Sequence, residues 1–125
     1  MRGVFDIAEF DVSFYAKADG TKPAREFILS LDAKMKAKIT RTILMLEING
    51  TELREPYSKH LRDGIFELRV KVGSNISRVL YFFVVGHHAV LTHGFVKKTD
   101  DVPSSEIEKA IKYRFEYLSR KEKKE

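Results

Sequence analysis

The segment 59-KHLRDGIFELRVKV-72 decides the fold, because its second half alternates strictly between apolar and charged residues. Every second position is apolar: Phe66, Leu68, Val70 and Val72. The positions between them are charged: Glu67, Arg69 and Lys71. Successive side chains of a β-strand point to opposite faces of a sheet, so the pattern predicts a strand with one buried face and one charged face.

The next segment, 76-ISRVLYFFVV-85, fits a central strand because it is apolar on both faces. Its one charge is Arg78. A two-residue turn at Ser74-Asn75, or a four-residue turn from Gly73 to Ile76, would place Lys71 opposite Arg78. We expect one of these turns, since a three-residue loop would place Arg78 among the valines, and an unpaired buried charge is costly.

A third strand, 89-AVLTHGFVKK-98, follows the Gly-His-His sequence at 86–88. A two-residue turn at Gly86-His87 or at His87-His88 would put alternate side chains of this strand on the same face as Arg78. These side chains are His93, Phe95 and Lys97. Several cations are therefore expected to converge on one surface of the sheet.

Upstream, 9-EFDVSFY-15 also alternates and predicts a first strand. Pro23 suits the first turn of a helix, and Asp32 can cap a second helix. The apolar stripe of that second helix is Met35, Ile39, Ile43 and Leu46. Asn49-Gly50 ends it.

Ser105 and Glu108 match a capping box, which predicts a C-terminal helix. Its amphipathic face would contain Ile107, Ala110, Ile111, Arg114, Phe115 and Leu118. We expect 119–125 to be a flexible tail. The chain is then one α+β domain over 1–125, with a mostly antiparallel four-stranded sheet, an N-terminal helix hairpin, a C-terminal helix, and a charged sheet face that is partly open.

The composition of the chain excludes several kinds of functional site. The chain has no cysteine, which excludes disulfides, a thiolate nucleophile and cysteine-based zinc sites. Its four histidines lack close acidic partners in the sequence, so we expect no metal, and we expect no cofactor. The N-terminus lacks the apolar core of a signal peptide, and the longest apolar run, 79-VLYFFVV-85, is too short to span a bilayer. We expect a cytoplasmic protein without a membrane partner.

The net charge is +5, and its location is informative. The block from Lys59 to Lys98 has seven basic and two acidic residues, which accounts for the whole excess. An excess confined to one block favours a surface that binds a polyanion over an evenly solvated surface.

In this order, the segments "KHLRDGIFELR", "SRVLYFF" and "LTHGFVKKT" resemble the RelE/ParE superfamily of bacterial toxins, most closely its HigB-type, phage-derived-protein-like branch. The resemblance implies a RelE-like fold and the toxin of a type II toxin–antitoxin system. It implies an endoribonuclease that cleaves translated mRNA on the ribosome without a metal, and a helix-turn-helix antitoxin bound in an oligomeric complex. ParE-like relatives imply an alternative, a DNA gyrase inhibitor without nuclease activity. A third hypothesis is an RNA-binding accessory protein.

The resemblance also implies site residues. The RelE pattern of two cations spaced i, i+2 falls on Glu67 and Arg69, so only the second is a cation here. The arginine of the next strand matches Arg78, and the closing basic pair matches Lys97-Lys98. The tyrosine that RelE carries after that pair has no counterpart in 99-TDDVPSS-105. HigB-type members place a histidine just before the second strand, which makes His60 a candidate.

Attack by an RNA 2′-hydroxyl needs a proton acceptor, cations on the phosphorane and a proton for the leaving oxygen. The catalytic candidates are Arg69, Arg78, Lys98 and His60. His93 and Glu67 are alternative proton carriers. The candidates for RNA binding are Lys59, Arg62, Lys71, Lys97, His93 and Phe95, the last by stacking on a base.

Overall fold

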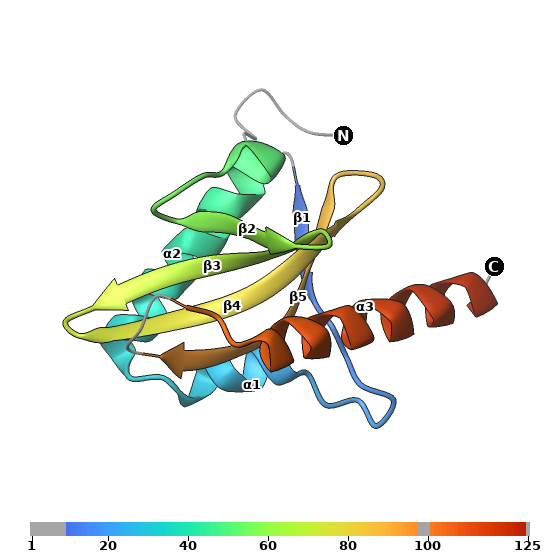
Figure 1. Ribbon diagram of the computed structural model, residues 1–125, viewed down its shortest axis with the longest axis horizontal. Coiled ribbons are helices and arrows are strands. Elements are labelled where there is room, and N and C mark those ends of the chain that lie inside the picture. The colour runs from blue at the N-terminus through green and yellow to red at the C-terminus, as the bar shows by residue number, and fades with distance from the viewer. Residues whose placement is uncertain (1–9, 98–100, 125) are drawn as a thin grey trace.

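The computed structural model describes residues 10–97 and 101–124. Its elements, in chain order, are β1 (Asp11–Phe14), α1 (Pro23–Ser30), α2 (Ala33–Asn49), the 3-10 helix η1 (Gly50–Glu52), β2 (Ser58–Arg62), β3 (Ile65–Val72), β4 (Asn75–Val84), β5 (His88–Lys97) and α3 (Ser104–Lys124). The strands form one sheet in the order β1-β5-β4-β3-β2 (Figure 1). The fold is α+β, as expected.

The structure differs in detail from the expected, mostly antiparallel sheet of four strands, because the sheet has five strands and is mixed. β2 is an additional strand, paired antiparallel with β3 at the edge of the sheet. Its sequence, SKHLR, has little apolar alternation, because an edge strand has one neighbour and often carries charges. β1 pairs parallel with β5, so the sheet is mixed. These two strands lie far apart in the sequence, and no local pattern fixes their relative direction.

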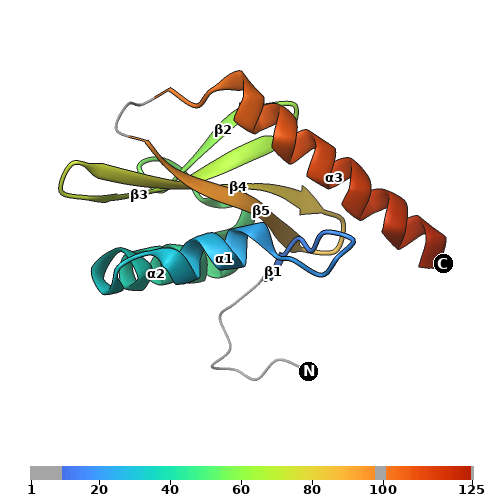
Figure 2. The ribbon, with the colours of Figure 1, turned by 90° about the horizontal axis from the view of Figure 1, so that it is seen from below.

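The helices lie on both sides of the sheet. Figure 2 shows α1 and α2 against one face and α3 against the other. The predicted signals of the helix hairpin are confirmed: Pro23 lies in the first turn of α1, and Asp32 Oδ1 accepts a hydrogen bond of 2.9 Å from the backbone N–H of Met35. α2 ends at Asn49, and the capping residue Gly50 has a φ of 53°, which suits glycine.

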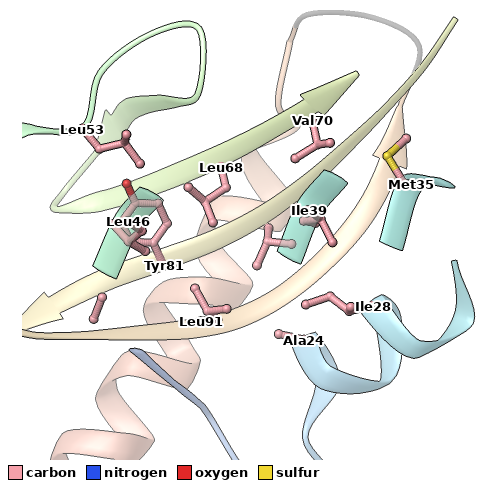
Figure 3. Close-up of a cluster of buried hydrophobic side chains, with 12 residues drawn as sticks. Ala24, Ile28, Met35, Ile39, Leu46, Leu53, Leu68, Val70, Tyr81 and Leu91 are labelled. Atoms are coloured by element: carbon pink, nitrogen blue, oxygen red, sulfur yellow. The ribbon is translucent and has the colours of Figure 1, made fainter. Parts of the chain in front are cut away.

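The main hydrophobic core lies between the sheet and the hairpin (Figure 3). Leu68 and Val70 of β3 are buried there, which confirms the predicted orientation of that strand. Tyr81 of β4 is also buried, and its hydroxyl shares a hydrogen bond with the Ser58 hydroxyl. From the helices, Met35, Ile39, Leu46, Ala24 and Ile28 complete the cluster.

A second core lies under α3, where Ile107 and Ala110 pack on apolar side chains of the sheet: Ile65, Leu80, Phe82 and Val90. The predicted apolar face of α3 is buried at the start of the helix, but two of its later residues are exposed. Phe115 is 71% exposed and Leu118 is 40% exposed, because the side chains that pack on the sheet at this level of α3 are Tyr113 and Tyr117. α3 begins at Ser104 and continues to Lys124, through most of the segment expected to be a flexible tail.

The β3–β4 hairpin has the predicted faces but a different register. Arg78 lies opposite Arg69, and not opposite Lys71. The two-residue loop is Gly73-Ser74, because glycine readily adopts the positive φ, here 61°, that a tight hairpin needs at its first loop position.

The β4–β5 hairpin has a three-residue loop, 85–87, where a two-residue turn was expected. The extra loop residue shifts the pairing of β5 by one position. A β-bulge in β5 reverses this shift, since Tyr81 pairs with Leu91 but Leu80 pairs with His93. The residue between them, Thr92, donates its hydroxyl to the Leu80 carbonyl at 3.1 Å. His93, Phe95 and Lys97 therefore lie on the Arg78 face, as predicted.

Candidate functional site

We call the side of β3, β4 and β5 that points away from α1 and α2 the charged face. The register puts seven candidate side chains on it: Glu67, Arg69, Lys71, Arg78, His93, Phe95 and Lys97. Lys59 of β2 joins them, because it lies opposite Glu67. The strands thus bring together most of the residues that the sequence singled out.

Arg78 is the centre of this face, but it is fully buried. Its Nη1 donates hydrogen bonds to Glu67 Oε2 at 2.9 Å and to Glu67 Oε1 at 3.2 Å. The expectation that Arg78 lies on an open part of the sheet is therefore wrong. Glu67, which appeared to break the pattern of cations, is the counterion that allows an arginine to be buried here.

Burial raises the pKa of Glu67, and the charges of Arg78 and Arg69 oppose this. Arg69 Nε lies 3.6 Å from Glu67 Oε1, and the Arg69 side chain is 26% exposed. One carboxylate thus lies between two arginines, which leaves the trio with one positive charge. Among the described residues, the accessible cations around it are Arg69 and the exposed lysines Lys59, Lys71 and Lys97.

His93 is buried beside the first turn of α3. Its Nε2 lies 3.0 Å from Glu106 Oε1, and its Nδ1 lies 3.1 Å from Thr92 Oγ1. The Thr92 hydroxyl has one proton and donates it to a carbonyl, so we infer that His93 Nδ1 is the donor in the second contact. The contact between Nε2 and Oε1 then needs a further proton, either on Nε2 or on the Glu106 carboxyl group.

Burial lowers the pKa of His93, whereas the neighbouring Glu106 carboxylate raises it. Sequence reasoning missed Glu106, because Ser105 and Glu108 were taken as the features of this helix start. One sequence feature could have identified Glu106: it is an acidic residue in the first turn of a helix that follows a basic strand.

His60 lies on the opposite face of the sheet. It pairs with Phe66, and the two rings are 4.9 Å apart between centroids. Its Nε2 accepts a hydrogen bond of 3.3 Å from the Gly64 backbone N–H. The structure does not bring His60 together with Arg69 or Arg78, because the additional strand β2 turns it toward the hairpin side.

The remaining candidates differ in setting. Arg62 forms an ion pair with Asp63 at 2.8 Å and a hydrogen bond to Ser104 Oγ at 3.2 Å, which places it at the start of α3. Phe95 is half-buried, with its ring centroid 6.0 Å from that of His93. Lys98 lies outside the described residues.

Within residues 10–97 and 101–124, no group of three or more His, Cys, Asp or Glu side chains is arranged to hold a metal ion. No helix in the same ranges is long and apolar enough to cross a membrane.

A family model described as "Phage derived protein Gp49-like (DUF891)" matches residues 26–114, from α1 into α3. The chain belongs to the Gp49-like family. This is a RelE-like, toxin-like family, so the coarse part of the resemblance is confirmed. A search of curated proteins gives no match.

Proposed function

We propose that this Gp49-like protein is the toxin of a type II toxin–antitoxin system, of the HigB type, and cleaves translated mRNA on the ribosome. The observation that carries the proposal is the charged face. In the part of the chain that the structure describes, four accessible cations surround the buried pair of Glu67 and Arg78: Lys59, Arg69, Lys71 and Lys97. Such a surface suits a phosphodiester backbone, because lysine and arginine side chains bind phosphate oxygens.

The reaction is an attack by the 2′-oxygen on the adjacent phosphorus. The bond between O2′ and phosphorus forms and the bond between phosphorus and O5′ breaks, which gives a 2′,3′-cyclic phosphate and a 5′-hydroxyl. The 2′-hydroxyl loses a proton and the leaving O5′ gains one, so the proton count balances without a metal or cofactor. Arg69 is suited to stabilise the charge that develops on the phosphorane.

The proton carrier next to the charged face is the pair of His93 and Glu106, in which Glu106 is the accessible member, at 22% exposed, and His93, at 6%, acts through it. Nε2 and Oε1 lie 3.0 Å apart, so a proton can pass between them and the pair can give up or accept one. It takes the place of His60, which lies on the other face. Arg78 acts as a positioning residue, because it holds the Glu67 carboxylate that in turn contacts Arg69.

A ParE-like gyrase inhibitor is the second candidate. Two observations favour it: Arg78 is buried and cannot contact a substrate phosphate, and Phe115 and Leu118 expose apolar surface on α3 that suits a protein partner. A helix-turn-helix antitoxin and an oligomeric toxin–antitoxin complex are proposed with either activity.

Induction of the protein in bacterial cells separates the two candidates. Primer extension on abundant messages would reveal new 5′ ends, and incorporation of labelled thymidine would follow replication. The endoribonuclease proposal predicts cut messages while replication continues at first. Growth arrest with intact messages and an immediate block of replication would replace it with the gyrase-inhibitor proposal.

A further inference from the structure

A groove lies between α2 and the outer edge of β3. β2 pairs with β3 from Ile65 to Leu68, and within the described residues no strand continues along this edge beyond Leu68. The space left there is a groove of about 240 Å³. It borders both faces of the sheet, since its lining includes Val70 from the hairpin side and Arg69 from the charged face.

The groove is positively charged. Lys38 of α2 and Arg69 and Lys71 of β3 line it, and among the described residues no acidic side chain does. Lys38 Nζ donates a hydrogen bond of 2.6 Å to the Lys71 carbonyl oxygen, which holds its ammonium group at the strand edge. Lys38 therefore adds a cation from α2 to Arg69 and Lys71 of the charged face, at the edge of the sheet.

The groove also contains an accessible aromatic ring. Tyr57 lines it and is 42% exposed. The Tyr57 carbonyl accepts a hydrogen bond of 2.9 Å from the Arg69 backbone N–H, which fixes the tyrosine backbone beside β3. Thr42 lines the groove from α2, but its hydroxyl is already bonded to the Lys38 carbonyl at 3.0 Å.

We propose that this groove binds one phosphate and the adjacent base of a single-stranded RNA. Lys38 and Lys71 would hold the phosphate, and the base would stack on the Tyr57 ring, since aromatic stacking is a common way of binding unpaired bases. The choice of RNA rests on the proposed function, because a strand whose scissile phosphate contacts Arg69 on the charged face can continue around the edge of β3. The helix hairpin thereby gains a role in holding the strand that is cut.

The test is binding of the trinucleotide ApApA to the purified full-length chain, measured by calorimetry over a range of salt concentrations. Lys38→Gln removes a charge but keeps a donor for the Lys71 carbonyl, and it should flatten the slope of log affinity against log salt by about 0.7. Tyr57→Ala should weaken binding about 5- to 100-fold, while Tyr57→Phe keeps the ring and should bind like wild type.

Lys34→Gln is the matched control, since Lys34 is exposed one helical turn earlier on α2 and does not line the groove. It should bind ApApA like wild type. Unchanged affinity in both Lys38→Gln and Tyr57→Ala would overturn the proposal. So would a groove that binds a hexaglutamate peptide but not ApApA, because that result would assign it to an acidic protein segment.

The same variants separate this inference from the endoribonuclease proposal. If Lys38→Gln and Tyr57→Ala lose ApApA binding while the wild type leaves messages intact, the groove is supported and the nuclease proposal fails. If the wild type cuts messages and both variants bind ApApA normally, the groove proposal fails alone.

Discussion

Arg78 Nη1 donates hydrogen bonds to both carboxylate oxygens of Glu67, at 2.9 and 3.2 Å. Neither side chain is more than 1% exposed to solvent. A buried ion pair of this kind gives little net stability compared with apolar residues, but the loss of one partner leaves an uncompensated charge in the protein interior. The pair therefore makes the centre of the charged face sensitive to single substitutions.

The first prediction concerns the stability of this pair. Arg78→Met keeps much of the side-chain length but leaves the buried Glu67 carboxylate without its main partner. The free energy of unfolding should fall by about 3–5 kcal/mol. Urea denaturation followed by circular dichroism measures it, with Lys97→Met, at an exposed position, expected within about 0.5 kcal/mol of wild type.

The combination of Glu67→Gln with Arg78→Met is the control for the pair itself. The double variant should lose less stability than the sum of the two single variants, because the second substitution removes the charge that the first leaves unpaired. Simple additivity of the two losses would show that the two side chains do not stabilise one another.

The second prediction concerns pH. Burial raises the pKa of Tyr81 to about 12, so the folded protein holds its hydroxyl proton more tightly than the unfolded chain does. The contribution of Tyr81 to the free energy of unfolding is fully present below pH 10. It falls by about 2.7 kcal/mol as the pH rises from 10 toward 12.

Urea unfolding at pH 8, 10 and 11.5 tests this, with Tyr81→Phe as the matched variant. The variant lacks the titrating group, so its stability should fall less steeply over this range than that of wild type. The pKa of Tyr15 is also about 12, but its effect is common to both proteins and cancels in the difference. Equal slopes for the two proteins would refute the assignment to Tyr81.

The fold was predictable where one strand or helix carries its own pattern. The alternation in β3 gave the correct buried face, and Asp32 and Gly50 gave the ends of α2. The parallel pairing of β1 with β5 and the edge strand β2 were not predictable, because pairing between distant segments depends on packing and not on local periodicity.

For the site, it was predictable which side chains share a face of the sheet, but not which of them contact one another. The alternation of β3, β4 and β5 placed Arg69, Arg78 and Lys97 on one face. The alternation did not indicate how far each side chain is buried, so the burial of Arg78 and its pairing with Glu67 were missed. The face on which His60 lies was not predicted, because it depends on β2. Glu106 was missed although it follows His93 by only 13 residues, because Ser105 and Glu108 were taken as the features of the helix start.

The third prediction concerns RNA affinity. Lys97→Gln removes an accessible cation of the charged face, so the slope of log affinity against log salt for a single-stranded RNA decamer should become flatter by about 0.7. Fluorescence anisotropy with a labelled decamer measures the slope. Lys22→Gln, at an exposed position next to α1, should leave the slope unchanged. A slope that stays the same in the Lys97 variant would place the RNA elsewhere.

The fourth prediction separates two histidines. Glu106→Gln and His93→Gln should each reduce the cleavage rate about 10²–10⁴-fold, because each removes one half of the proposed proton-transfer pair. His60→Gln should cleave at the wild-type rate, since His60 lies on the opposite face. Single-turnover cleavage as a function of pH measures all three, with thermal unfolding to confirm that each variant is folded. Loss of cleavage in the His60 variant alone would reverse the assignment.

The central claim is that the charged face cuts the message on the ribosome, and reconstituted translation with a 5′-labelled message tests it most directly. The wild-type protein should yield fragments that end in a 2′,3′-cyclic phosphate, and Arg69→Gln should form them about 10²–10³ times more slowly while remaining folded. An intact message with the wild-type protein, or an undiminished rate with the Arg69 variant, would contradict the account.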